Sequence, residues 1–513
     1  MKTKIKNLFL LPALIAGLNL IPAGRVTAQT FTTLHTFTAT DFNTGTNSDG
    51  ATPIGGLILS GNTLYGTAAG GGSSGNGTVF AVQTNGTGFT NLYSFTATSG
   101  GYSTNSDGAY PRAGLILSGN TLYGTAEGGG SSGNGTVFAV STNGTGFTNL
   151  YSFTALSDGY YGTNSDGTIP EAGLILSGNT LYGTAGRGGS RGYGTVFAVQ
   201  TNGTGFTNLH SFTAVPGSVA NSDGAYPWAG LILSGNALYG TVEFGGSSGR
   251  GTVFAVNNDG TGFTNLYSFT ATPPYPATPT NGDGANPYAG LILSGNTLYG
   301  TATAGGSGGN GTVFAVNTNG TGFTNLHSFM AMSTNSSGRY TNSDGAIPGA
   351  GLILSGNTLY GTATQGGSEF AGTVFAVHTD GTGFTNLYSF TALSATSPYT
   401  NSDGATPDAG LILSGNTLYG TAFRGGSSGN GTIFSLSLGS VSAPAPTLTI
   451  FPSGTNVVLT WPTNAAGFTL QSTTNLVSPA VWSTVSPGPV VVNGQYAVTN
   501  STSGTNKFYQ LSQ

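Results

Sequence analysis

The sequence contains no cysteine, and charged residues make up only 5% of its 513 positions. Without cysteine the chain forms neither disulfides nor thiolate metal sites, so its stability and chemistry depend on other side chains. Its 11 Lys and Arg residues are scattered, whereas nucleic-acid binding needs a concentrated positive surface. After residue 28 no run is long and apolar enough for a transmembrane helix. We therefore expect no nucleic-acid partner and no membrane insertion of the mature chain.

Residues 1–28 have the three-part pattern of an export signal. A basic start precedes an apolar run over residues 8–23, and small residues at 26–28 form a cleavage pattern. Cleavage after Ala28 would remove Lys2, Lys4, Lys6 and Arg25 and leave a mildly acidic chain. This pattern predicts a secreted or cell-surface protein.

The sequence is rich in glycine, 89 residues in all, and in repetition. The motif GLILSGNTLYGTA, first found at residues 56–68, returns in close variants seven times, with spacings of 57 to 61 residues. Its tyrosines are Tyr65, Tyr123, Tyr182, Tyr239, Tyr299, Tyr360 and Tyr419. A fixed period indicates a repeat architecture, in which neighbouring units bury each other's apolar faces.

Each unit holds four short apolar runs separated by turn residues. In the first unit they are residues 56–60, 63–68, 77–82 and 89–96, and Gly61 with Asn62 forms a hairpin turn between the first two. Four antiparallel strands repeated seven times predict an all-β fold, a seven-bladed β-propeller of four-stranded blades over residues 29–439. A β-helix needs shorter coils, and a helical solenoid needs a 3.6-residue apolar period that this sequence lacks.

The repeat begins and ends out of phase. A strand like the fourth of each unit lies at residues 31–38 (FTTLHTFT), while the seventh unit stops after its third strand (GTIFSLS from Gly431). We expect the N-terminal strand to complete the last blade and close the ring, because this removes two exposed sheet edges.

The unit also resembles known repeats. Residues Pro53, Leu64, Tyr65, Gly71, Gly72, Phe80 and Phe89 hold places comparable to those of a kelch-type blade, although the Gly pair comes late and Phe replaces the usual Trp. The cadence LYGT, GG, GTVF is similar to the GloVer tandem repeat of exported bacterial proteins over residues 31–438. This resemblance implies export and surface display, and it brings no known chemistry.

The period ends near Gly439. A Pro- and Ala-rich linker at residues 440–446 leads into residues 447–513, whose apolar runs at 456–461, 467–471, 489–492 and 507–511 resemble a small fibronectin type III-like β-sandwich. We expect Trp461 and Trp482 in its core.

Differences among the seven units indicate a candidate binding surface. All length variation lies in the link from the fourth strand to the next unit, which shares a face with the loop between strands two and three. Charged and aromatic residues gather there, as a binding rim would require, or as drift after duplication on one side would produce. The candidate binding residues are Arg112, Glu127, Glu171, Arg187, Trp228, Glu243, Phe244, Tyr288, Asp408, Phe423 and Arg424.

Three classes of function fit this surface. Aromatic and arginine side chains suit an extracellular glycan or a surface protein as partner. Alternatively, Glu127, Glu171 and Glu243 supply the paired carboxylates of a carbohydrate-active hydrolase or lyase. A structural matrix protein would need no ligand.

One aspartate recurs in each link, usually within Asn-Ser-Asp-Gly: Asp49, Asp107, Asp166, Asp223, Asp283, Asp344 and Asp403. Either the Asp bonds its own backbone in a turn with Gly at positive φ, which we favour, or the fragment belongs to a calcium loop that lacks its first and last acids. His35, His210 and His327 replace a tyrosine of the fourth strand and are read as aromatic substitutes. We therefore expect no metal and no cofactor.

Overall fold

The computed structural model describes residues 29–99, 103–157, 162–213, 220–273, 278–335, 338–439, 446–463, 468–477, 480–492, 494–501 and 507–512. The expected export signal and linker residues 440–445 lie outside these ranges. The chain divides into two compact units, Thr30–Leu438 and a second formed by Met1–Gln29 with Gly439–Gln513, and each is described by itself. None of the described residues forms a helix long and apolar enough to cross a membrane.

The described part of Thr30–Leu438 is all β and contains seven four-stranded antiparallel sheets. Six of these sheets each come from one continuous stretch of the chain, and we number them as units one to six. Units one to three are β2 (Ile58–Ser60), β3 (Thr63–Ala68), β4 (Thr78–Gln83) and β5 (Thr90–Ser94); β6 (Ile116–Ser118), β7 (Thr121–Ala126), β8 (Thr136–Ser141) and β9 (Thr148–Ser152); and β10 (Ile175–Ser177), β11 (Thr180–Ala185), β12 (Thr195–Gln200) and β13 (Thr207–Ser211). Units four to six are β14 (Ile232–Ser234), β15 (Ala237–Val242), β16 (Thr252–Asn257) and β17 (Thr264–Ser268); β18 (Ile292–Ser294), β19 (Thr297–Ala302), β20 (Thr312–Asn317) and β21 (Thr324–Ser328); and β24 (Ile353–Ser355), β25 (Thr358–Ala363), β26 (Thr373–His378) and β27 (Thr385–Ser389). A small ribbon of β22 (Ser333–Thr334) and β23 (Tyr340–Thr341) lies in the link before unit six.

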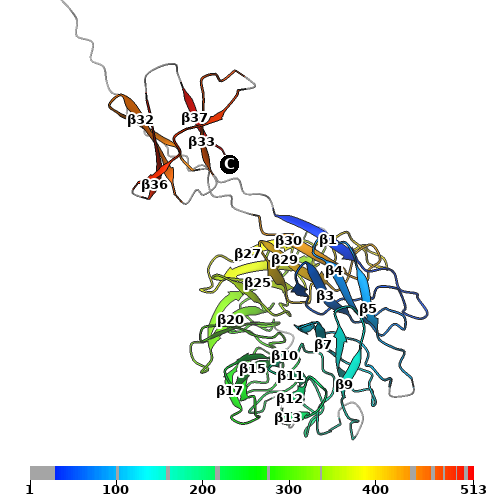
Figure 1. The fold of residues 1–513 in the computed structure, drawn as a ribbon. Helices are drawn as coiled ribbons and strands as arrows, with labels where there is room; N and C mark the ends of the chain where they lie inside the picture. The colour runs from blue at the N-terminus through cyan, green and yellow to red at the C-terminus, as the bar shows by residue number, and fades with distance from the viewer. Residues whose placement is uncertain are drawn as a thin grey trace, which may run out of the picture. The chain divides into compact units, whose positions relative to one another are not determined.

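Unit seven is assembled from both ends of the repeat. Its strands are β28 (Ile412–Ser414), β29 (Thr417–Ala422), β30 (Thr432–Ser437) and, paired antiparallel with β30, β1 (Thr30–Thr36). The register places Phe31 opposite Leu436 and Thr36 opposite Thr432. Figure 1 shows the sheets following one another in chain order, with β29 and β30 beside β1 and β3.

The third strand of each unit is buried on both sides, because a neighbouring sheet covers either face. In β4 the residues from Thr78 to Val82 are all buried. The first strand is shorter than predicted: β2 begins at Ile58, and Gly56 before it lies beside the backbone of unit seven, where a Cβ would be 3.5 Å from the Gly410 carbonyl oxygen.

Neighbouring units are joined by one buried hydrogen bond that repeats seven times. A threonine hydroxyl of the second strand donates to a backbone carbonyl of the following unit, over 2.8 to 3.3 Å. The pairs are Thr67 with Ala113, Thr125 with Ala172, Thr184 with Ala229, Thr241 with Ala289, Thr301 with Ala350, Thr362 with Ala409, and Thr421 with Gly55. The last pair joins unit seven to unit one.

Each recurrent aspartate ties a link to the fourth strand of the preceding sheet. Asp107, which is 3% exposed, accepts hydrogen bonds from the Tyr93 hydroxyl at 2.7 Å and from the Thr96 backbone N–H at 2.9 Å. His35 occupies the place of Tyr93 beside Asp49 and stacks on Phe89 with ring centroids 3.8 Å apart. The interpretation of these histidines as aromatic substitutes is therefore confirmed.

The turn prediction needs one correction. Asp107 does not close the turn, because its carboxylate accepts bonds from the fourth strand instead. Asn105 closes it: its Oδ1 accepts from the N–H of Gly108 at 2.9 Å, and Gly108 has φ of 109°. Among the described residues, no group of three or more His, Asp or Glu side chains forms a metal site.

The C-terminal segment contains two antiparallel sheets. One is ordered β31 (Thr449–Ser453), β32 (Asn456–Pro462), β36 (Gln495–Ser501), β35 (Val490–Val492), and the other β34 (Ser483–Thr484), β33 (Thr469–Thr473), β37 (Phe508–Ser512). Side chains of both sheets share one core around Trp461, which is 1% exposed. Trp482 lies outside that cluster and is half-buried, so its predicted core position is wrong; Val485 lies in the core instead.

Phe37 tests the junction between the first and last units. Its ring is fully buried in a cluster that includes Leu57 of unit one and Ile433 of unit seven. Phe37→Ala should lower the free energy of unfolding by roughly 3–5 kcal/mol, because it leaves a cavity in that junction. Phe42→Ala is the matched control, since Phe42 is 99% exposed. Equal denaturation midpoints for both variants would contradict this role of the junction.

Asp107 tests the tie between link and sheet. Asp107→Ala should destabilise the chain by roughly 2 kcal/mol or more, because it leaves the Tyr93 hydroxyl and a backbone N–H without their charged acceptor. Asp380→Asn serves as the control, since four other units have Asn at this exposed hairpin position. Urea titration of both variants should show a loss for the first only.

Candidate functional site

The links and the loops between second and third strands lie at the same end of every sheet, as the sequence predicted. Isolated β-bridges join them, for example Ala51 with Gly70 and Ala109 with Gly128. The variable residues of the chain are therefore gathered on one surface, which we call the link–loop face.

One variable residue of each unit reaches the same pocket. This central pocket has a volume of about 200 Å³ and is lined by the residue that follows the proline of every unit: Ile54, Arg112, Glu171, Trp228, Tyr288, Gly349 and Asp408. Burial alternates along the segment before β6: Pro111, Ala113 and Leu115 are buried, whereas Arg112 and Gly114 are partly exposed, and Arg112, Ala113 and Gly114 line the pocket.

Side chains from different units bond one another across the central pocket. The Arg112 guanidinium pairs with Glu127 of its own unit, and its Nε lies 3.6 Å from Glu171 Oε1 of unit three. The Tyr288 hydroxyl of unit five donates to Glu171 Oε2 at 3.2 Å, although the two residues are 117 positions apart.

Trp228 is held from two sides. Its indole N–H donates to Glu243 Oε2 at 2.9 Å, and its ring lies on Gly186, where a Cβ would come within 2.0 Å of the ring. No side chain other than hydrogen fits at that position without moving the indole.

Burial raises the pKa of three carboxyl groups in or beside the central pocket, those of Glu171, Asp408 and Glu243. Burial raises the pKa of Glu171 to about 7, and the neighbouring Glu127 adds to the rise while Arg112 opposes it. Burial also raises the pKa of Asp408 to about 6, against the attraction of Arg112. Burial raises the pKa of Glu243 as well, with the Trp228 hydrogen bond partly offsetting it. Within the part of the chain that the structure describes, Asp408 accepts no side-chain hydrogen bond.

Several predicted site residues lie elsewhere. Glu127 and Glu243 contact the pocket residues, whereas Arg187, Phe244, Phe423 and Arg424 do not line the pocket. Phe244 packs edge-on against Tyr226 with centroids 6.0 Å apart, and the Arg187 Cζ lies 5.4 Å from the same ring. Arg424 lies over Phe423 at 5.2 Å. The predicted rim is therefore several separate clusters.

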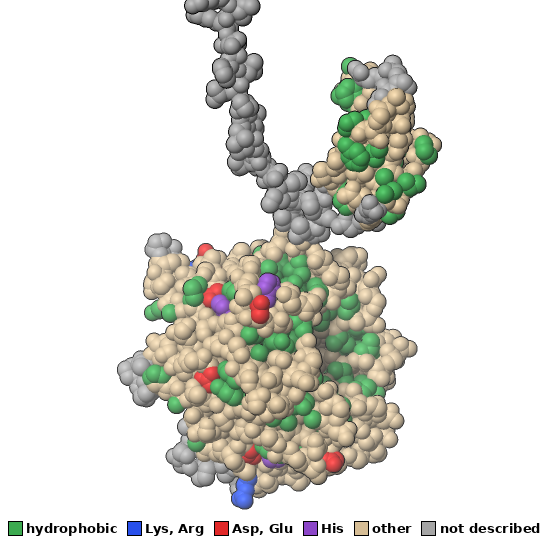
Figure 2. Space-filling model, turned by 90° about the vertical axis from the view of Figure 1, so that its left-hand side faces the viewer, with side chains coloured by type: hydrophobic (Ala, Val, Ile, Leu, Met, Phe, Trp, Pro, Cys, Tyr) green, Lys and Arg blue, Asp and Glu red, His purple; other side chains and the backbone are tan. Residues whose placement is uncertain are grey.

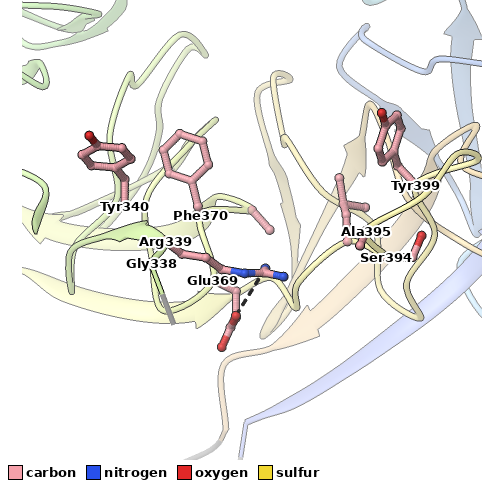
Figure 3. A pocket seen from close by; sticks show the side chains of 10 residues that line it. Gly338, Arg339, Tyr340, Glu369, Phe370, Ser394, Ala395 and Tyr399 are labelled. Atoms are coloured by element: carbon pink, nitrogen blue, oxygen red, sulfur yellow. Dashed lines mark ion pairs between the residues drawn. The ribbon is translucent and has the colours of Figure 1, made fainter. Parts of the chain in front are cut away.

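The structure adds residues that the sequence prediction left out. Ile54 and Gly349 complete the central pocket, and their position after the proline is the signal that identifies them. A further pocket of about 410 Å³, drawn in Figure 3, lies beside unit six and includes Arg339, Glu369 and Phe370. Glu127 also lines a cavity of about 580 Å³ with Tyr110.

The sequence matches the Gloeobacter/Verrucomicrobia repeat in three overlapping segments, residues 23–162, 102–223 and 218–342. The chain belongs to this repeat family. No curated protein matches it.

Solved structures resemble the chain at low identity. The GH74 enzyme of Niastella koreensis matches with 16% identity, 82% of this chain, 58% of that chain and a TM-score of 0.44. An oligogalacturonate lyase in complex with manganese matches with 11% identity, 82% and 98% coverage and a TM-score of 0.43. The oligogalacturonate lyase of Vibrio parahaemolyticus matches with 9% identity, 81% of this chain, 98% of that chain and a TM-score of 0.43.

The raised pKa values predict how stability depends on pH. Glu171 and Asp408 bind protons more tightly when the chain is folded, so their contribution to stability is complete below their ordinary pKa values and is lost as pH rises through about 6 to 7. Asp408→Asn should therefore melt higher than the wild type at about pH 8 and equally at about pH 4. Parallel curves of melting temperature against pH for the two proteins would contradict this.

Proposed function

We propose that Thr30–Leu438 is a closed seven-bladed β-propeller of kelch-like layout and that it acts as an exported binding protein. Its seven four-stranded sheets support the blade count. Closure is supported by the pairing of β1 with β30 and by the hydrogen bond from Thr421 to the Gly55 carbonyl, which completes the series of contacts between units. In this arrangement the central pocket lies at one mouth of the propeller axis.

We also propose that residues 1–28 direct export, so that the mature protein is secreted or lies at the cell surface. The basic, apolar and small-residue segments support this location. The two C-terminal sheets with a shared core around Trp461 favour a fibronectin type III-like sandwich acting as a spacer.

One observation carries the binding function: the variable residue of every unit lines the same pocket. The Ala and Gly residues that follow them are nearly constant, so the seven variable residues differ at the one place where they meet. A site whose scaffold is uniform and whose lining is varied is suited to recognition of a specific ligand.

The ligand we propose is the end residue of a glycan that carries an amino group. Four carboxyl groups lie in or beside the pocket, those of Glu127, Glu171, Glu243 and Asp408, against a single guanidinium, that of Arg112, so the site attracts positive charge. A volume of about 200 Å³ lies below the range of about 300–1,000 Å³ typical for drug-sized ligands, which favours one small terminal group. Trp228 and Tyr288 supply amphipathic rings beside it.

A second candidate is a carbohydrate-active hydrolase or lyase at the same pocket. It is favoured by Glu171, whose pKa of about 7 suits a general acid at neutral pH, with Asp408 as a further carboxylate. Release of reducing ends from a polysaccharide, abolished by Glu171→Gln, would establish this reaction instead of binding alone.

The binding proposal is tested with oligosaccharides of chitosan, which carry ammonium groups, and of chitin, which carry neutral acetamides. The wild type should bind the chitosan series more tightly, because the carboxylates of the pocket attract ammonium groups. Asp408→Asn should weaken binding by about tenfold, and a Trp228→Ala, Tyr288→Ala double variant should remove it. Phe42→Ala is the control. Equal affinity of wild type and Asp408→Asn, or no preference for chitosan, would refute the proposal.

A further inference from the structure

A second pocket lies on the link–loop face, and it shares no lining residue with the central pocket. It has a volume of about 410 Å³ and is formed by three segments: the link before unit six, the loop between β25 and β26, and the link after unit six. Figure 3 shows Tyr340 and Phe370 toward one side of this pocket and Tyr399 toward the other, with Arg339 and Glu369 between them.

Phe370 has a backbone conformation that disfavours it. Its φ is +61°, in the left-handed region that a bulky residue rarely adopts, and its side chain is 40% exposed. The other six units have glycine at this position, also with positive φ: Gly75, Gly133, Gly192, Gly249, Gly309 and Gly429. The fold therefore needs only glycine here, and the ring adds strain without filling a core.

Two tyrosines accompany this replacement. Tyr340 and Tyr399 are 62% and 53% exposed, and each stands four residues before the buried aspartate of its link. The links on either side of unit six are the two that carry an aromatic residue at this place, since the corresponding residues of the others are Gly45, Ser103, Gly162, Val219 and Pro279. Three separate segments thus bring exposed rings to one pocket.

The polar groups of this pocket have no net charge. Arg339 Nη1 lies 3.6 Å from Glu369 Oε2, and both side chains are 42% exposed, so donors and acceptors remain accessible. Glu369 is again particular to unit six, because the corresponding residues elsewhere are Ser74, Ser132, Arg191, Ser248, Gly308 and Ser428.

This combination fits an uncharged sugar chain. A pyranose ring presents C–H groups on its faces, which pack on aromatic rings, and hydroxyls at its edge, which bond to an Arg–Glu pair. Charged side chains are few on the face drawn in Figure 2, in keeping with the 5% of charged residues in the sequence, so this surface offers little to attract a charged partner. We propose that the pocket of Tyr340, Phe370 and Tyr399 binds a segment of a neutral polysaccharide.

Affinity electrophoresis of the full chain in gels with soluble xyloglucan, mixed-linkage β-glucan or glucomannan tests this proposal. At least one polysaccharide should retard the wild type. Phe370→Gly should weaken that binding by about tenfold or more while its melting temperature stays equal or rises, because it restores the residue of the other six units. Tyr340→Ala should weaken binding in the same way, and Phe42→Ala should not.

Other outcomes would overturn the proposal. Retardation by none of the polysaccharides, or equal retardation of wild type and Phe370→Gly, rejects the site. Binding of a displayed peptide that depends on Phe370, without polysaccharide binding, would assign the pocket to a protein partner. Asp408 lines only the central pocket, and Phe370 lines only the second pocket. Failure of the central-pocket proposal and failure of the polysaccharide proposal therefore show up in different variants.

Discussion

The structure depends on the close contact between neighbouring units at their innermost strands. There a threonine hydroxyl bonds the backbone of the next unit, from Thr67 to the Ala113 carbonyl in the first case. Beside it the chains approach so closely that a Cβ at Gly114 would lie 2.9 Å from the Gly56 carbonyl oxygen. This close approach keeps the two positions after the variable residue small, Ala113 and Gly114 in unit two, so the variable residue supplies the larger side chain of the pocket lining.

A second set of contacts holds the links in place. The residue before each proline has positive φ, and its N–H donates to a loop carbonyl of the preceding unit, as Ile169 does to Asn134. A β-branched residue adopts this conformation only where surrounding contacts impose it. With the buried aspartates, these bonds anchor the base of every link, so variation in length is confined to the exposed remainder.

Charged side chains are concentrated at positions where the seven units differ in sequence. A chain with 5% charged residues brings Arg112, Glu171 and Asp408 into one pocket and pairs Arg339 with Glu369 in another. Both sites are formed by individual residues that differ from one unit to the next. The repeat therefore provides geometry, and a few departures from it provide chemistry.

The sequence by itself determined the repeat, the four strands of each unit, the shared face of links and loops, and the one variable residue after each proline. These follow from local alternation and from comparison of the units with one another. It missed the role of the aspartates, the half-buried Trp482 and the strain at Phe370, because burial and φ depend on neighbouring segments. Only the tertiary structure decided that Tyr288 meets Glu171 while Phe244 and Phe423 stay apart from them. That outcome depends on how many units intervene and at what angle they pack, which no local pattern of residues encodes.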